Sequence, residues 1–381
     1  MKISVAPLLC LTFILASLHL YGAQEETNPL FLIRQNNRYG YIDKTGKIVI
    51  KPQFRFASGF SEGLASVELW DGYRGYIDKT GQVVIKITGL GGDFSDGVAQ
   101  INTALTFGCI DKTGGYVIKP QSDMLPASSK GYRAEFSEGL LAVYIPSTEL
   151  YGYIDKTGQF VIKPQFRVVH NFSEGLAAAS FKDMTYGYID KTGQVVIKPR
   201  FGWARDFSEG LARVPFGTHS SYIDKTGKFA IESCFNYASP FSEGLAAVQI
   251  NENDKFGYID KTGTFIIEPQ FEDAESFSEG LAWVRFGIRS GYIDKKGQTV
   301  FKLPYPIRGG YWRSGFHNGL AEIAEYSWID KSGRFVWKSD ELRMVEWRVR
   351  GVALFVFLIL ALFVGLLIKK YRRSKKQTGP V

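Results

Sequence analysis

The chain has 381 residues with 15% aromatic side chains and 41 glycines, and its formal net charge is +8. After Lys2 and the six basic residues of the C-terminal tail are subtracted, the remaining charge is only +1. The basicity therefore belongs to the two ends and gives no support to a nucleic-acid-binding surface. Abundant glycine and aromatic residues are typical of a turn-rich β protein.

Residues 1–23 have the pattern of a secretory signal peptide. Lys2 precedes a largely apolar stretch that ends in the small pair Gly22-Ala23. A positive start, an apolar middle and a small-residue end are the features that direct export and cleavage. We therefore predict that the mature chain begins near residue 24.

Residues 24–346 are predicted to form one repeat domain. The tripeptide Ile-Asp-Lys recurs nine times, at intervals of 33 to 44 residues. Its copies begin at Ile42, Ile77, Ile110, Ile154, Ile189, Ile223, Ile259, Ile293 and Ile329. A second motif, Phe-Ser-Glu-Gly-Leu-Ala, keeps phase with the first and begins at Phe60, Phe172, Phe207, Phe241 and Phe277. Such periodicity indicates stacked units that cannot bury their hydrophobic faces alone.

Each unit is predicted to contain three strands, and the second unit illustrates them. Its strands cover residues 64–69, 75–77 and 83–86. Residues 78–81, Asp-Lys-Thr-Gly, have the chemistry of a hairpin turn, because aspartate accepts a backbone hydrogen bond and glycine adopts the left-handed conformation. Most third strands end in Lys-Pro, where we expect pairing to stop because proline has no N–H group.

The predicted fold is an all-β tandem array of about nine β-hairpin repeats of ~35 residues. We favour an open or superhelical stack, since a propeller blade needs four strands and typically about 40–45 residues. A closed propeller-like ring is the alternative if the connection around Gln165-Phe166 supplies a fourth strand. Cys109 and Cys234 fall in different phases of the repeat, so we expect unpaired thiols, with a single bridge conceivable only in a closed ring.

Two units depart from the pattern. The third has a longer polar connection, Gln121 to Glu135, and the eighth replaces the usual Pro-Gln-Phe connection with Leu303 to Trp312. Insertions in repeat arrays often map to one face and sometimes bind a partner. Drift without function is the simpler explanation, and we favour it.

The combination of Tyr-Ile-Asp-Lys-Thr-Gly, Lys-Pro and Phe-Ser-Glu-Gly-Leu-Ala resembles the WG-repeat (KWG-type) family of bacterial proteins. The resemblance covers roughly Tyr39 to Trp337. The Trp-Gly pair of that family is not literal here, and pairs such as Tyr151-Gly152 stand in its place. The resemblance implies a β-rich repeat array and no common catalytic activity.

Residues 347–368 are predicted to form a single transmembrane helix. Gly351 to Ile368 contains no charge, and at ~1.5 Å per residue this stretch approaches the ~30 Å hydrocarbon core of a bilayer. The basic tail, residues 369–381, has the composition of a cytoplasmic flank. We therefore expect a single-pass membrane protein with its repeat domain outside the cytoplasm.

The sequence predicts no enzyme, no cofactor and no metal site. Asp155 and Glu174 recur at the same turn positions of other units, so we interpret them as structural rather than as an acid-base pair. His170, His219 and His317 lie in unrelated settings without the spacing of metal ligands.

Tryptophans that do not follow the repeat are the candidate binding residues, namely Trp203, Trp283 and Trp312. Exposed tryptophan rings stack on sugars or form hot spots for proteins, although filling the core is the simpler role. The predicted function is a membrane-anchored, non-enzymatic scaffold that binds a protein or glycan of the cell envelope and no nucleic acid.

Two other functions remain open. A glycan hydrolase of the envelope would place its site in the third or eighth unit, with Asp123, Glu135 or Arg308 lining a cleft. The ectodomain of a membrane sensor would need a partner, because the tail is too short for an output domain.

Overall fold

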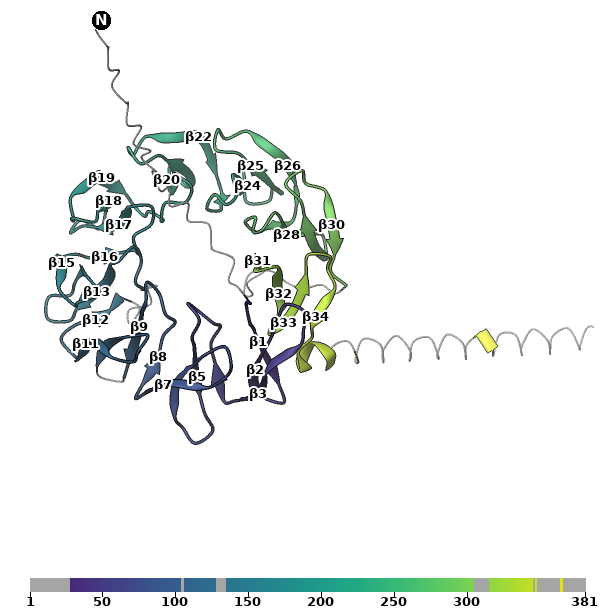
Figure 1. Ribbon diagram of the computed structural model, residues 1–381. Coiled ribbons are helices and arrows are strands. Elements are labelled where there is room, and N and C mark those ends of the chain that lie inside the picture. The colour runs from purple at the N-terminus through teal and green to yellow at the C-terminus, as the bar shows by residue number, and fades with distance from the viewer. Residues whose placement is uncertain are drawn as a thin grey trace, which may run out of the picture.

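The computed structural model describes residues 28–103, 106–127, 135–304, 315–344, 347 and 364–365. These residues form nine antiparallel sheets, each made of consecutive strands, and the sheets stand as blades around a ring (Figure 1). Blade 1 contains β1–β3, blade 2 β4–β7, blade 3 β8–β11, blade 4 β12–β15, blade 5 β16–β19, blade 6 β20–β22, blade 7 β23–β26, blade 8 β27–β30 and blade 9 β31–β34.

Four classes of strand recur from the axis outward. The innermost are β4 (Phe56–Ala57), β8 (Leu90–Gly91), β12 (Leu125–Pro126), β16 (Val168–Val169), β23 (Tyr237–Ala238), β27 (Asp273–Ala274) and β31 (Phe316–His317). The second are β1 (Phe31–Gln35), β5 (Ala65–Glu68), β9 (Val98–Asn102), β13 (Leu141–Ile145), β17 (Leu176–Ser180), β20 (Ala212–Phe216), β24 (Ala246–Gln249), β28 (Ala282–Phe286) and β32 (Leu320–Ala324).

The third class carries the start of the Ile-Asp-Lys motif, and the fourth forms the outer edge. The third strands are β2 (Arg38–Ile42), β6 (Arg74–Ile77), β10 (Phe107–Asp111), β14 (Leu150–Ile154), β18 (Tyr186–Asp190), β21 (His219–Ile223), β25 (Phe256–Ile259), β29 (Arg289–Ile293) and β33 (Ser327–Asp330). The outer strands are β3 (Ile48–Phe54), β7 (Val83–Ile87), β11 (Tyr116–Gln121), β15 (Phe160–Phe166), β19 (Val195–Phe201), β22 (Phe229–Phe235), β26 (Phe265–Phe271), β30 (Thr299–Lys302) and β34 (Phe335–Trp337). A helical turn covers residues 340–344.

The ring is closed, so the open stack that the sequence favoured is wrong. The turn at Gly46 of blade 1 packs against Val336 of blade 9, in the same way that the turn at Gly227 of blade 6 packs against Ile197 of blade 5. The innermost strand is the fourth strand that the sequence did not reveal. It has only two residues, which is too short for a period-two pattern to be visible.

The Asp-Lys-Thr-Gly turns have the predicted geometry. In blade 2, one carboxylate oxygen of Asp78 accepts hydrogen bonds from the Thr80 N–H at 2.9 Å, the Thr80 hydroxyl at 2.6 Å and the Gln82 N–H at 3.1 Å. Gly81 has a φ of 87°, which glycine adopts at little cost. Each repeated aspartate of this kind is therefore used inside its own turn.

Proline does not end the outer strands, contrary to the sequence prediction. In blade 1, β3 continues beyond Pro52, and Phe54 pairs with Tyr39. The register shifts between these pairs, and a Cβ at Gly40 would lie 2.6 Å from the Pro52 nitrogen. Proline is tolerated because it lies in a bulge on an edge strand, where no ladder donor is needed.

The core between blades is built from the repeated tyrosines and phenylalanines. In blade 4, Tyr153 is buried and packs against Phe172 with ring centroids 4.8 Å apart. Its hydroxyl donates to the His170 carbonyl of blade 5 at 2.7 Å. Burial raises the pKa of the Tyr153 hydroxyl well above its ordinary value. The repeated phenylalanines therefore fill the core between neighbouring blades.

The repeated Ser-Glu-Gly turns bind each blade to the next. In blade 5, the Ser173 hydroxyl donates to the Phe207 carbonyl of blade 6 at 2.7 Å. The Glu174 carboxylate accepts from the Gly210 N–H at 2.9 Å and pairs with Lys225 at 3.1 Å, both in blade 6. We call this set of three contacts the inter-blade ladder. The serines at this position are Ser61, Ser95, Ser137, Ser173, Ser208, Ser242 and Ser278, and each donates to a carbonyl of the next blade.

Several sequence predictions fall outside the described residues. The signal peptide, residues 1–23, and nearly all of the transmembrane segment, residues 347–368, belong to this group. No helix within the described ranges is both long and apolar enough to cross a membrane. Cys109 and Cys234 are both free, as expected, and burial raises the pKa of the Cys109 thiol to about 12.

Candidate functional site

The regular pattern changes at the inner edge of β1. In blade 2, the Ser58 N–H of the inner segment donates to the Ser66 carbonyl of the second strand at 2.9 Å. Blade 6 has no assigned inner strand, yet its Arg205 N–H donates to the Arg213 carbonyl in the same way at 3.0 Å. The carbonyl at this position therefore normally accepts a main-chain N–H of its own blade.

In blade 1 the matching carbonyl accepts a side chain from blade 9 instead. The register places Leu32 at the position of Ser66, because Phe31 pairs with Ile42 as Ala65 pairs with Ile77. The Leu32 carbonyl accepts the indole N–H of Trp328 at 2.8 Å. Trp328 occupies the position before Ile-Asp-Lys, where most units carry tyrosine, and the larger indole spans the distance to the second strand.

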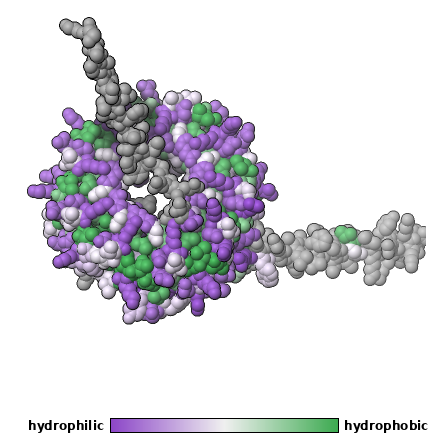
Figure 2. Space-filling model, viewed as in Figure 1, coloured by the Kyte–Doolittle hydropathy of each residue, from purple (hydrophilic) through white to green (hydrophobic). Residues whose placement is uncertain are grey.

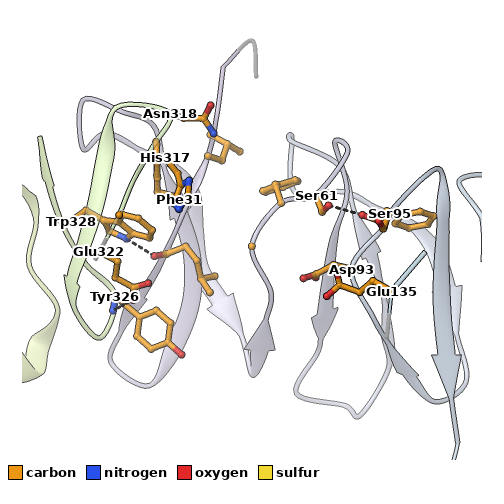
Figure 3. A pocket seen from close by; sticks show the side chains of 16 residues that line it. Phe31, Ser61, Asp93, Ser95, Glu135, His317, Asn318, Glu322, Tyr326 and Trp328 are labelled. Atoms are coloured by element: carbon orange, nitrogen blue, oxygen red, sulfur yellow. Dashed lines mark hydrogen bonds between the residues drawn. The ribbon is translucent and has the colours of Figure 1, made fainter. Parts of the chain in front are cut away.

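A pocket of about 500 Å³ lies at this place, lined by residues of blades 9, 1, 2 and 3 and by Glu135 of blade 4 (Figure 3). Phe31 and Trp328 form its apolar part, with ring centroids 5.1 Å apart. Beside them, the Glu322 carboxylate accepts the Tyr326 N–H at 2.7 Å. Asp93 of blade 3 and Glu135 of blade 4, which lies between β12 and β13, line another part of the pocket. The wall is therefore aromatic on one side and carries three carboxylates.

A second hollow of about 210 Å³ adjoins the first. It shares Asp93, Ser95 and Glu135 with the larger pocket. No described residue forms a hydrogen bond or ion pair with the Asp93 carboxylate, and its charge acts on two neighbouring tyrosines. Burial chiefly, and the Asp93 charge in addition, raise the pKa values of Tyr41 and Tyr76. The pocket wall is thus a region of negative potential.

The three predicted tryptophans do not come together. Trp283 lies in the core with 2% of its surface exposed, which is the core-filling role, so its ring is not available to a surface ligand. Trp203 is partly exposed in the inner segment of blade 6. Neither lines either hollow. Trp312 lies outside the described residues.

The residues named for a hydrolase are also separated. Glu135 lines both hollows, whereas Asp123 is exposed in a bend and lines neither. Arg308 falls outside the described residues. A different carboxyl, Glu275, is half-buried on the inner segment of blade 8, and burial, together with the nearby Asp273 charge, raises its pKa. Sequence reasoning missed this carboxyl.

No group of histidine, cysteine, aspartate or glutamate in the described part of the chain could hold a metal ion. His170 is paired instead with Asp206 of blade 6, at 2.9 Å from Nδ1 to Oδ1. His317 lines the larger pocket.

Of the pocket residues, the sequence analysis named Glu135, as a residue that would line a hydrolase cleft, and His317, whereas Phe31, Asp93, Glu322 and Trp328 escaped it although a signal was present. Trp328 replaces the repeated tyrosine, and His317-Asn318-Gly319 replaces Ser-Glu-Gly in blade 9. Both departures fall in the unit that closes the ring, where blade 1 supplies the facing surface. Without closure, nothing in the sequence connected them with Phe31 or Asp93.

Figure 2 shows hydrophobic side chains in separate patches around the ring, with hydrophilic side chains between them. Exposed apolar side chains recur on the outer strands, for example Val84, Val161 and Val196. Each is followed within two residues by a lysine, and lysine and proline on edge strands discourage pairing with other chains. The exposed apolar side chains on the described outer strands are therefore accompanied by charges that oppose pairing with another chain.

Comparison with solved structures supports the propeller fold. The crystal structure of a eukaryotic initiation factor matches with a TM-score of 0.52 and 11% identity, covering 72% of this chain and 84% of that chain. BamB from Moraxella catarrhalis matches with a TM-score of 0.39 and 13% identity over 80% and 91% of the two chains. The computationally designed Ika8 protein gives 0.40 and 13% over 73% and 96%. Only the first match has a TM-score above 0.5, and at 11% identity it supports the fold alone.

The sequence has no significant match among curated proteins. A family model described as "WG containing repeat" matches six stretches, residues 39–72, 107–145, 151–183, 186–214, 221–253 and 256–287. These stretches cover most of blades 4–7 and parts of blades 1, 2, 3 and 8, and they contain the contacts between blades 4 and 5 and between blades 5 and 6 described above. On this evidence, the chain belongs to the family of WG-repeat proteins.

Proposed function

We propose that the ring is a non-enzymatic scaffold that binds a protein or glycan of the cell envelope through the pocket lined by blades 9 and 1–4. In this proposal residues 1–23 direct export, and residues 347–368 anchor the ring with its blades outside the cytoplasm and the basic tail inside. The apolar character of residues 351–368 and the charges that follow them support the anchor.

One observation carries the binding proposal. Around most of the ring, the repeated polar side chains are used in turns and in the inter-blade ladder, as Asp78 and Glu174 illustrate. At the pocket the repeated residues are replaced by Trp328, His317 and Asn318, and the surface is concave. A concave site with an aromatic wall and a few polar groups is the usual form of a ligand pocket.

The test uses the full-length chain in detergent as bait for the envelope proteins and purified envelope glycans of its source cell. Three baits are compared: the wild type, Asp93→Lys in the pocket, and Asp123→Lys as the matched control, since Asp123 is exposed and does not line the pocket. We expect one partner to be retained by the wild type and the control and lost by Asp93→Lys. Equal retention by all three baits would place binding elsewhere.

A hydrolase has one observation in its favour. Glu135 lies beside Asp93 in the pocket (Figure 3), and glycoside hydrolysis needs two carboxyl groups flanking the scissile bond. If this function applies, the full-length protein releases reducing sugar from envelope glycan, and both Asp93→Asn and Glu135→Gln abolish the release. Binding without release by the wild type supports the scaffold.

A further inference from the structure

We propose that the pocket takes an extended peptide segment, with an aromatic side chain next to lysine or arginine, as the innermost strand of blade 1. This inference rests on the proposed scaffold function and names the class of partner. It combines three features of the site: the inner edge of β1, the aromatic wall at Trp328, and the carboxylates that face them.

The inner edge of β1 has the register of the second strands that carry an inner strand. In blade 2, Phe56 and Ala57 pair with Glu68 and Val67. In blade 5, Val168 and Val169 pair with Ser180 and Ala179 in the same way.

By register, the matching positions of blade 1 are Arg34 and Ile33. In the described residues, blade 1 has three strands, and β1 is at the edge of its sheet. A two-residue strand added at Ile33 and Arg34 could donate a main-chain N–H to the Arg34 carbonyl, as Arg55 does to Glu68 in blade 2. Trp328 keeps the Leu32 carbonyl, so the added strand would form a shortened version of β-strand addition.

The aromatic side chain fits a position that other units fill from their own sequence. In blade 5, Phe172 lies five residues before Ala177 and packs against Tyr153 of blade 4. The equivalent of Ala177 in blade 1 is Phe31. Five residues before it stands Glu26, so the sequence offers a carboxylate where the repeat has phenylalanine.

Blade 9, which precedes blade 1 around the ring, carries Trp328 at the position that Tyr153 has in blade 4. Phe31 already contacts Trp328, with ring centroids 5.1 Å apart, so an aromatic ring from another molecule would pack beside this pair, in the pocket that both residues line. An edge-to-face arrangement such as that of Phe31 and Trp328 is worth about 0.5–1.5 kcal/mol beyond area burial.

Charge distinguishes two possible occupants of the pocket, the chain's own N-terminal segment, residues 24–27, and a separate partner. Asp93, Glu135 and Glu322 line the pocket. The N-terminal segment contains Glu25 and Glu26 and no basic residue. Carboxylates of the same charge repel one another, whereas a lysine or arginine next to the aromatic residue would be attracted to the pocket wall. The observations therefore favour a basic, aromatic segment of another protein.

The experiment measures binding of short fluorescent peptides to the full-length protein in detergent by anisotropy. The reference peptide alternates lysine with small residues around one phenylalanine. Its variants replace phenylalanine by alanine, replace the lysines by glutamate, or carry N-methylated main-chain nitrogens at the predicted paired positions. We expect each change to weaken binding about tenfold or more, because each removes one of the three contacts.

The protein variants separate the source of each effect. Asp93→Lys should weaken binding of the lysine peptide and strengthen binding of the glutamate peptide, while Asp123→Lys should change the binding of neither. Circular dichroism checks that both variants are folded. A chain without residues 24–27 should bind the lysine peptide within threefold of the wild type. Much tighter binding would mean that the N-terminal segment fills the groove, and would overturn the proposal.

Three outcomes separate this inference from the function it rests on. If no peptide binds but an envelope partner is still lost on Asp93→Lys, the strand-addition proposal is wrong and the scaffold stands. If the N-methylated peptide binds as well as its parent, charge alone explains the affinity and strand addition is again wrong. If neither peptide nor envelope partner responds to Asp93→Lys, both proposals fail.

Discussion

The interface between blades 5 and 6 and the interface between blades 9 and 1 perform the same task with different side chains. At the first, Ser173 and Glu174 form the inter-blade ladder with blade 6. At the second, the equivalent turn of blade 9 carries His317 and Asn318. The contacts there include the Trp328 bond to β1.

The helical turn at residues 340–344 adds to the closing interface. The Asp340 carboxylate accepts the Asn36 N–H at 2.7 Å, and Glu341 pairs with Arg34 at 3.5 Å. The tyrosine hydroxyls of Tyr39 and Tyr326 lie 3.3 Å apart across the same interface. The comparison teaches that the repeat specifies how a blade joins the next one, while the closure depends on residues that occur once.

The largest effect is expected at the closing interface. Trp328→Ala should lower the free energy of unfolding by about 2–4 kcal/mol, since it removes a large aromatic contact with Phe31 and the bond to the Leu32 carbonyl. Urea unfolding of the full-length protein, followed by circular dichroism, measures it.

Trp328→Phe and Tyr188→Phe serve as matched controls for that variant. Each keeps a ring and loses one hydrogen bond to a carbonyl, to Leu32 in one case and Arg205 in the other. Both should cost about 1–2 kcal/mol. If Trp328→Ala costs no more than Tyr188→Phe, the closure does not depend on Trp328, and the comparison fails.

A smaller effect is expected from the charged part of the ladder. Lys225→Met removes the ion pair with Glu174, whose side chain is 31% exposed, so the loss should be about 0.3–1 kcal/mol. Lys44 is the lysine of the same motif in blade 1, and no ion pair is recorded for it among the described residues. Lys44→Met should therefore change the unfolding free energy by less than about 0.3 kcal/mol. Equal losses for both variants would show that the ladder extends through the closure.

The smallest effect concerns the turns. The Thr192 hydroxyl, with the main-chain N–H groups of the turn, lowers the pKa of Asp190. Because the folded pKa is below the unfolded value, this aspartate stabilises the fold above about pH 4, and the contribution is lost as the pH falls through the folded pKa.

Thr192→Val should raise the pKa of Asp190 towards its ordinary value of about 3.9. NMR titration of the carboxyl carbon measures the change, with Asp224 as the internal reference because its own turn is intact. A pKa of Asp190 that does not move would mean that the N–H groups alone hold it low.

The sequence predicted the unit well and the ring poorly, for a physical reason. Asp78, Gly81 and the repeated phenylalanines act within one unit or between neighbours, so their pattern is visible at short sequence separation. Closure depends on pairs such as Phe31 and Trp328, which are almost three hundred residues apart. Nothing local marks such a pair.

The same reason explains the candidate site. The tryptophans were identified by residue type alone, and Trp283 proved to be a core residue. The pocket forms where Trp328, which replaces the repeated tyrosine in the last unit, faces Phe31 in the first unit. Only the three-dimensional contact between the two ends of the repeat makes this replacement meaningful.

Among the described residues, every blade is built from consecutive strands, and no sheet joins the first blade to the last. The gain or loss of one whole unit by gene duplication or deletion would therefore leave every remaining sheet intact and alter only the circumference. The same independence should allow circular permutation, in which the old termini are joined by a linker and new termini are opened at another inter-blade connection. In evolutionary terms, the number of units is the variable and the residues of the closing interface are the constraint.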